Sequence, residues 1–182
     1  IVLKSSTNKG FTGGNNIGMD FALQKGYEYI MMLNNDVAVE PNFLEPLIAR
    51  LDQDPSVGAV QPLIYFHHDR HLIWNAGSRY LSWIGLPLTL MYFRKDPLRK
   101  QTMEQKKIDW ITGCAFIMRS EVLKKTGTLK ERYFIYFEDV DLSFRIKKAG
   151  YTLSYVSESV IYHIAGMAHK SKTKEKEGFL SP

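Results

Sequence analysis

The sequence predicts an α/β domain in which a mixed, mostly parallel sheet is packed between helices. Strand-like apolar runs alternate with segments of helical periodicity, which is the pattern of layered α/β proteins. Residues 29–33 form a continuous apolar run, as expected for a strand buried on both faces of such a sheet. The length of 182 residues, with 45% hydrophobic and 24% charged side chains, fits one globular domain with a sizeable core.

The first elements follow from the positions of glycine and asparagine. Residues 1–3 are expected to form a short strand, and the glycine-rich stretch 8–16 a loop. Asn16 is expected to cap a helix that ends at Gly26, because Asn favours N-caps and Gly favours the left-handed residue after a helix. The strand at residues 29–33 follows this helix.

The middle of the chain contains a helix, a strand and a long irregular stretch. Pro41 is expected at a helix start, since apolar residues recur at helical spacing over residues 43–51. Residues 57–65 predict the next strand. Residues 66–109 mix histidines, tryptophans and turn formers, which indicates a variable insertion with hairpin-like strands. Within it, the stretch 83–93 favours a core strand over contact with a membrane surface.

The remaining elements alternate again between strand and helix. Expected here are a strand at 109–118, a short helix capped by Ser120 and ending near Gly127, a helix from Asp139 or Asp141 to Gly150, and strands at 151–156 and 160–163.

Composition excludes several function classes. The net charge of +5 suits an anionic small substrate or an anionic membrane surface, and no dense Arg/Lys stripe indicates nucleic-acid binding. The single cysteine, Cys114, excludes a disulfide framework and favours a reducing, cytoplasmic compartment. The apolar stretch 81–93 is shorter than the ~20 residues of a membrane-spanning helix. Contact with the inner face of a membrane stays open, and so does the oligomeric state.

The domain is expected to span residues 1–169, with a flexible, solvated tail at 170–182. The tail is rich in lysine, and charge runs are usually solvated. Its lysines are Lys170, Lys172, Lys174 and Lys176.

Asp36 follows the strand predicted at residues 29–33. In open α/β sheets, ligands bind outside the carboxyl ends of the strands. Asp36 is therefore a candidate ligand for Mn²⁺ or Mg²⁺, which bind one or two carboxylates together with substrate phosphates. The alternative is a turn or capping residue ahead of Pro41, and spacing alone does not decide between the two.

A second acidic cluster contains Glu138, Asp139 and Asp141 and follows the aromatic stretch 133–137. Acids at a helix N-terminus are stabilised by the helix dipole, which accounts for one or two of them. Apolar walls raise a carboxylate's pKa and suit it to general-base work, which makes Asp139 the candidate base. Arg145 is spaced for an ion pair with Asp141 on the same helix face.

Histidine and glycine provide weaker signals. His163, on a strand expected near the end of the chain, is either a core histidine or a neutral imidazole ligand, and His169 is a weaker candidate. The glycine-rich loop does not match a Walker loop or the dinucleotide fingerprint, although its amides can line a sugar or a phosphate. The remaining histidines are expected at the surface: His67, His68 and His71.

These stretches together resemble the family 2 glycosyltransferases of the GT-A fold, in particular the bacterial rhamnosyltransferase-like branch. The resemblance spans nearly the whole chain, and its aromatic-acid segment is highly specific. The matching stretches are residues 8–11, 14–18, 33–37, 110–115, 133–145, 148–151 and 162–163. It implies a truncated three-layer GT-A sandwich, because family members begin with a nucleotide-binding part, ~60 residues for a βαβ unit with its linkers, that is expected before residue 1.

The resemblance also implies roles for individual residues. Asp36 looks like the metal ligand of a DxD-type motif, with His163 as a further ligand, and Asp139 like the catalytic base of inverting members. Glu138 and Asp141 would orient the acceptor or the base, and Trp110 and Gly113 resemble acceptor-side residues. Contacts with the nucleotide-sugar donor are implied for Asn8, Gly10, Phe11, Gly14, Asn15, Asn34, Asn35 and Arg145.

The expected activity is metal-dependent, inverting transfer of a sugar from a nucleotide-diphosphate donor to a glycan or lipid-linked glycan, as in cell-surface polysaccharide synthesis. Two alternatives remain. One is a nucleotidyltransferase, which is also α/β and metal-dependent. The other is a catalytically silent carbohydrate-binding domain of similar fold.

Overall fold

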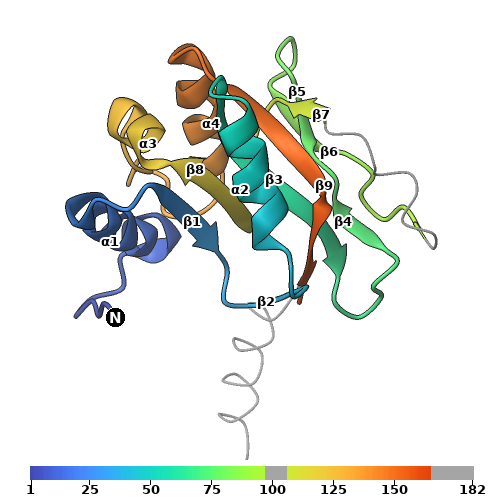
Figure 1. Ribbon diagram of the computed structural model, residues 1–182, viewed down its shortest axis with the longest axis horizontal. Coiled ribbons are helices and arrows are strands. Elements are labelled where there is room, and N and C mark those ends of the chain that lie inside the picture. The colour runs from blue at the N-terminus through green and yellow to red at the C-terminus, as the bar shows by residue number, and fades with distance from the viewer. Residues whose placement is uncertain (97–105, 165–182) are drawn as a thin grey trace, which may run out of the picture.

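A computed structural model describes residues 1–96 and 106–164. Its elements in chain order are α1 (Gly10–Lys25), β1 (Tyr29–Leu33), β2 (Val37–Val39), α2 (Leu44–Gln53), β3 (Val57–Phe66), β4 (Ile73–Asn75), β5 (Ser78–Leu81), β6 (Leu86–Thr89), β7 (Lys106–Ile108), β8 (Ala115–Arg119), α3 (Ser120–Thr126), α4 (Glu138–Lys148) and β9 (Thr152–His163). The main sheet has the order β1-β8-β3-β9-β2, with β4 paired to β3 and β7 paired to β9 (Figure 1). No helix in these described ranges is long and apolar enough to cross a bilayer.

The core confirms a three-layer arrangement. Side chains alternate along each strand, so neighbours on β8 face opposite sides of the sheet. Ile117 packs with Leu47 and Leu51 of α2 on one face. Phe116 and Met118 pack on the other face with the remaining helices. Their contributions are Met19 from α1, Val122 and Leu123 from α3, and Leu142 and Ile146 from α4.

The mixed sheet is confirmed, but the expectation that it is mostly parallel is wrong. Among the described strands only β3 and β9 pair in parallel. The other pairings are antiparallel, including β1 with β8 and β2 with β9. The error has a physical cause: an apolar run shows that a strand is buried and says nothing about its direction. In β1, moreover, only Ile30 and Met32 are fully buried.

The N-terminal expectations need correction. Residues 1–3 form no strand and are exposed. The glycine-rich stretch belongs to α1, which begins at Gly10 and ends at Gly26 in the left-handed conformation expected there. Asn16 is therefore a residue of the helix interior, not its cap. Gly10 has φ +70°, and a Cβ there would lie 2.6 Å from the ring of Phe134, so glycine permits this close start.

The stretch 66–109 does contain hairpin-like strands, as expected. β5 and β6 pair with each other in a two-stranded sheet apart from the main one. The core strand expected at 83–93 is absent, because Trp83 and Ile84 are exposed in the turn between β5 and β6. The strand expected at 109–118 is restricted to β8.

Two further boundaries differ from expectation. Ser120 is the first residue of α3 rather than its cap, and its hydroxyl donates to the Tyr27 carbonyl. The two strands expected at 151–156 and 160–163 are one strand, β9, with a register irregularity opposite Pro62 and Leu63. The expected tail at 170–182, with His169, lies outside the described residues.

Candidate active site

Asp36 lies in the tight connection between β1 and β2. The backbone N–H of Asn34 donates to the Cys114 carbonyl at 2.9 Å, and the N–H of Ile164 donates to the Asp36 carbonyl at 2.8 Å. β2 then pairs with β9 so that Val37 stands opposite His163. Strand pairing thus brings together two residues far apart in sequence.

The side chains of Asp36 and His163 meet directly. His163 Nε2 lies 3.3 Å from Asp36 Oδ2, and both side chains are largely buried. Burial lowers the pKa of His163, against the opposing effect of the Asp36 carboxylate, and so favours the neutral imidazole. Trp74 packs edge-on against the imidazole, with ring centroids 4.5 Å apart.

Two atoms of this pair have no hydrogen-bond partner. Asp36 Oδ1 and His163 Nδ1 are buried and unpaired, and buried polar atoms of this kind call for a partner. One carboxylate and one neutral imidazole fit Mn²⁺ or Mg²⁺ when substrate phosphates and water complete the coordination. Within residues 1–96 and 106–164, no cluster of three or more His, Cys, Asp or Glu side chains is arranged to hold a metal.

Asp139 lies in the first turn of α4 and is held by backbone groups. Its Oδ2 accepts the N–H of Gly113 at 2.8 Å, and its Oδ1 accepts the N–H of Val140 at 2.8 Å. Burial raises the pKa of Asp139, and these hydrogen bonds oppose the rise. The result is a fixed carboxylate that is more basic than an exposed aspartate.

Glu138 is the more buried neighbour of Asp139, with 4% of its surface exposed. Its Oε2 has no hydrogen-bond partner, and burial raises its pKa. A Cβ on Gly113 would lie 3.4 Å from Glu138 Oε1 and 3.5 Å from Asp139 Oδ2. Glycine at position 113 therefore keeps the space in front of both carboxylates open.

Residues 113 and 114 connect the two acidic places. The Gly113 N–H holds Asp139, while the Cys114 carbonyl holds the turn that carries Asp36. Burial, and to a smaller extent the charge of Asp36, raise the pKa of the Cys114 thiol. This junction was not found from the sequence, where the stretch appeared as a continuous strand.

Asp141 and Arg145 form the ion pair that their spacing predicts. Arg145 Nε lies 2.8 Å from Asp141 Oδ2, and Arg132 approaches the same carboxylate at 3.4 Å. Arg145 also donates to the carbonyls of Thr126 and Gly127. These contacts tie α4 to the end of α3, so Arg145 and Asp141 have structural partners here.

Trp110 faces the β5–β6 hairpin. Its indole Nε1 donates to the Arg79 carbonyl at 3.0 Å, and only 9% of the residue is exposed. Gln61, which the sequence did not single out, accepts the Thr112 N–H at 3.1 Å and donates to Asn75, so a buried polar network supports the loop before Gly113.

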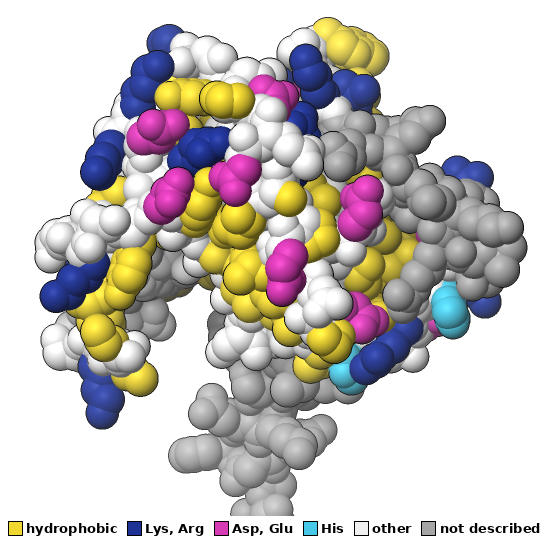
Figure 2. Space-filling view, in the orientation of Figure 1, with side chains coloured by type: hydrophobic (Ala, Val, Ile, Leu, Met, Phe, Trp, Pro, Cys, Tyr) yellow, Lys and Arg dark blue, Asp and Glu magenta, His cyan; other side chains and the backbone are white. Residues whose placement is uncertain are grey.

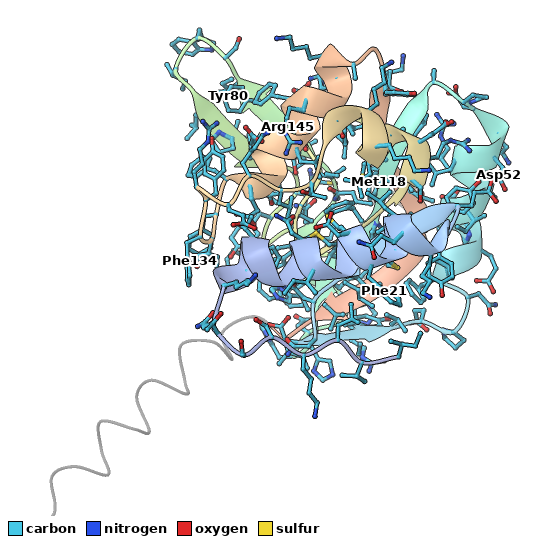
Figure 3. The ribbon with its side chains drawn as sticks, turned by 90° about the vertical axis from the view of Figure 1, so that its left-hand side faces the viewer. Phe21, Asp52, Tyr80, Met118, Phe134 and Arg145 are labelled. Carbon is cyan, nitrogen blue, oxygen red and sulfur yellow. The ribbon has the colours of Figure 1, made fainter. Side chains whose placement is uncertain are left out.

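The residues predicted to contact the donor fall into three groups. Near the start of α1, the side chain of Asn8 accepts the Gly10 N–H, and the Phe11 N–H donates to the Phe134 carbonyl; Figure 3 shows Phe134 beside this end of the helix. Gly14 and Asn15 line a hollow of about 280 Å³ between α1 and β1. Asn34 and Asn35 precede Asp36 in its turn.

A second hollow, of about 310 Å³, lies along the outer face of α4. Tyr80, Tyr133, Phe137 and Phe144 provide aromatic walls, and Asp141, Arg145 and Lys148 the charges. Figure 3 shows Tyr80 and Arg145 on this side of the molecule. The hollow borders α4 without including Asp139. The surface histidines His67, His68 and His71 are exposed, as expected.

Comparison with known proteins assigns the family. Residues 4–177 match the family described as "Glycosyltransferase like family 2", and the chain belongs to it. An N-acetylglucosaminyl-diphospho-decaprenol L-rhamnosyltransferase of Mycobacterium tuberculosis is 27% identical over 145 residues, which cover 75% of this chain and 47% of that protein. Rhamnosyltransferase WbbL of Escherichia coli is 23% identical, covering 89% of this chain and 63% of that protein. The chain spans about half the length of the first of these relatives.

Solved structures confirm the fold. GalNAc-T7, crystallised with UDP, GalNAc and Mn²⁺, superposes with a TM-score of 0.65 at 22% identity, covering 89% of this chain and 32% of that one. A197 from STIV superposes with a TM-score of 0.55 at 16% identity, covering 90% of this chain and 71% of that one. The domain therefore has a GT-A-type fold.

Proposed function

We propose that this domain carries the metal and acceptor sides of an inverting glycosyltransferase, which moves a sugar from a nucleotide-diphosphate donor to a glycan or lipid-linked glycan. The observation that carries the proposal is the buried carboxylate of Asp139, held by the Gly113 N–H at 2.8 Å. Membership of the family supports glycosyl transfer as the reaction class. The decaprenol-linked substrate in the name of the mycobacterial relative supports a lipid-linked acceptor.

Asp36 and His163 would hold the metal ion. A bound divalent cation would neutralise the negative charge that develops on the leaving diphosphate. The neutral imidazole of His163 and the unpaired Asp36 Oδ1 are available as ligand atoms. The short turn from Asn34 to Asp36 would place donor phosphates at the end of β1, where ligands bind in open α/β sheets.

Asp139 would act as the general base. It takes the proton from an acceptor hydroxyl while that oxygen attacks the anomeric carbon, and attack from the face opposite the leaving diphosphate inverts the configuration. Its raised pKa favours proton uptake, and its two backbone hydrogen bonds fix its direction. The unpaired Oε2 of Glu138 would bind a second hydroxyl of the acceptor sugar.

The place of action that fits a lipid-linked acceptor is the cytoplasmic face of a membrane. The acceptor's lipid would stay in the bilayer while its sugar reaches Asp139. Peripheral contact with the membrane, together with the synthesis of cell-surface polysaccharide, belongs to this proposal.

A donor screen on the full-length protein tests the proposal. A panel of nucleotide-diphosphate sugars is incubated with Mn²⁺ or Mg²⁺, with and without extracted lipid-linked acceptors, and nucleoside diphosphate release is measured. Release that depends on Asp139 is expected. Release of pyrophosphate instead would indicate nucleotidyl transfer, and sugar binding without turnover under every condition would indicate a silent carbohydrate-binding domain.

A further inference from the structure

The β5–β6 hairpin presents apolar side chains to solvent. Its two strands pair only with each other among the described elements, and the hairpin projects from the edge of the molecule near α4 (Figure 1). At its turn, Trp83 is 81% exposed and Ile84 is 51% exposed. Leu86 and Leu88 on β6 are exposed as well. Removing such side chains from water is favourable. Exposed apolar patches of this kind often mark a binding surface, here the tip formed by Trp83 and Ile84.

The base of the hairpin carries two cations and one carboxylate, because Arg79 and Lys147 both pair with Asp109, at 3.9 and 3.0 Å. Arg79 is the only charged residue of the segment 78–89, and its side chain is 56% exposed. Beside the hairpin, Tyr80 packs edge-on against Phe144 of α4, over which the Lys147 ammonium lies 5.9 Å from the ring centroid. Figure 2 shows hydrophobic side chains at the projecting tip with Lys and Arg side chains next to them. Tryptophan, aliphatic side chains and nearby cations are the combination that binds the headgroup region of anionic bilayers.

We propose that the β5–β6 hairpin docks the domain on an anionic lipid bilayer, with Trp83 and Ile84 inserted at the headgroup level. A bilayer fits better than a second protein copy. Stable protein interfaces bury roughly 800 Å² on each partner, whereas the exposed apolar surface here is concentrated on a narrow tip. A narrow apolar tip with cations at its base suits insertion between lipids.

The base of the hairpin is tied to the loop that holds the candidate base. Asp109 Oδ2 accepts the Tyr80 N–H at 3.1 Å, and the Trp110 indole donates to the Arg79 carbonyl at 3.0 Å. The same loop continues to Gly113, which holds Asp139. A docked hairpin would therefore set the height of Asp139 above the bilayer. This step rests on the proposed function, whereas the docking itself does not.

Vesicle binding tests the docking without any need for activity. The full chain is mixed with sucrose-loaded vesicles of phosphatidylcholine alone or with phosphatidylglycerol, and bound protein is measured by sedimentation over a lipid titration. We expect binding to the anionic vesicles, and at least tenfold weaker binding of the variant Trp83→Ser/Ile84→Ser. A matched control, Tyr27→Ser/Leu44→Ser, removes two exposed apolar side chains elsewhere, at 53% and 40% exposure, and should bind like the wild type.

Two results would overturn the docking proposal. Absence of binding, or equal binding by the hairpin variant, overturns the proposal. A change of oligomeric state in the hairpin variant without vesicles, measured by light scattering, assigns the tip to self-association and overturns it too. Tryptophan fluorescence adds a second readout. The chain also contains Trp74 and Trp110, so a shift to shorter wavelength on vesicle binding that is lost in the hairpin variant reports insertion of Trp83. Vesicle binding with no transfer from any donor would contradict the proposed function and leave the docking standing.

Discussion

The backbone N–H of Gly113 lies 2.8 Å from Oδ2 of Asp139, so a loop residue without a side chain holds the candidate base at the start of α4. The next residue, Cys114, holds the turn of Asp36 through its carbonyl. Two neighbouring peptide groups therefore connect the carboxylate that would activate the acceptor with the carboxylate that would bind metal. The relative position of the two depends on one short piece of backbone.

The first prediction concerns the base. Asp139→Asn keeps an oxygen that accepts the Gly113 N–H and removes the ability to take a proton. We expect kcat to fall by about 10²–10⁴-fold, the usual contribution of a general base. Donor affinity, measured by calorimetry on the full-length protein, should stay within about twofold. Asp20→Asn, at an exposed position of α1, is the matched control and should behave like the wild type. Equal losses in turnover and in donor affinity would contradict the assignment.

The second prediction concerns the open space at Gly113. Gly113→Ala adds a Cβ that meets Glu138, Asp139 and Phe11 at 3.4–3.5 Å, which are ordinary contact distances. The variant should fold with nearly unchanged Tm, but its methyl group would occupy the space that an acceptor hydroxyl needs. We expect transfer to fall by about tenfold or more, mainly through the KM of the acceptor.

Two other glycines provide the contrast. Gly10→Ala should lower Tm clearly, because its Cβ would lie 2.6 Å from the Phe134 ring at φ +70°. Gly14→Ala meets nothing within 4 Å and should leave stability unchanged or raised. Normal transfer by a folded Gly113→Ala variant would show that the acceptor does not approach from this side.

The third prediction concerns the metal pair. Asp36→Ala and His163→Ala each remove one of the two protein ligands, so Mn²⁺ affinity in the presence of a nucleoside diphosphate should fall at least tenfold. Electron paramagnetic resonance of free Mn²⁺ measures this without turnover. Asp20→Ala again serves as the control. Unchanged Mn²⁺ binding in both variants would remove this pair from the metal site.

Parts of the fold were predictable because local patterns determine them. The helical spacing around Leu47 and Leu51, the run that became β3 and the helix end at Gly26 all depend on neighbouring residues. Strand direction was not predictable, because it depends on pairing with distant strands. Asn16 was misread for a related reason. Its amide suits an N-cap and a buried backbone contact equally well, and only its distant partner Leu129 decides between them.

In the site, too, features set by neighbouring residues were predictable and contacts between distant residues were not. Asp36 and Asp139 were candidates from residue type and position at element ends, and His163 was either a core histidine or a ligand. The structure brings Asp36 and His163 into contact. Trp74 was not identified, although it packs on His163, because that contact arises from the separate pairings of β4 and β9 with β3. The contacts of Arg145 with α3 carbonyls were likewise invisible in its spacing from Asp141.

The fourth prediction concerns Asn16, whose side chain exchanges two 2.9 Å hydrogen bonds with the backbone of Leu129. Asn16→Ala leaves a buried N–H and a buried carbonyl without partners. At ~1–3 kcal/mol for each of these two groups, we expect the free energy of unfolding to fall by about 2–6 kcal/mol, measured by urea denaturation. Asn15→Ala is the control, because the Asn15 side chain bonds only within its own helix, to the Phe11 carbonyl, and should cost much less. Similar losses of unfolding free energy in both variants would show that the two Asn16–Leu129 hydrogen bonds do not stabilise the packing of α1 on the loop after α3.

The fifth prediction uses the raised pKa of Glu138. Burial, with a smaller effect of the Asp139 charge, raises this pKa above its usual value of 4.5, so the folded state binds the proton more tightly than the unfolded state does. The resulting stabilisation is complete below the unfolded pKa and is lost as pH rises through the folded pKa. Glu138→Gln cannot ionise and also resembles the protonated form in shape. Its Tm should therefore exceed that of the wild type at pH 8, and the difference should shrink as pH falls toward 4.

Thermal melts between pH 4 and pH 8 measure this difference for the wild type and the variant. Glu131→Gln is the matched control, because Glu131 is exposed and its replacement should leave the shape of the Tm profile unchanged. Asp139 also has a raised pKa but is present in both proteins, so the difference between the two profiles reports on Glu138. Parallel profiles for wild type and Glu138→Gln would mean that Glu138 titrates as it does in the unfolded chain, and that its burial does not oppose its charge.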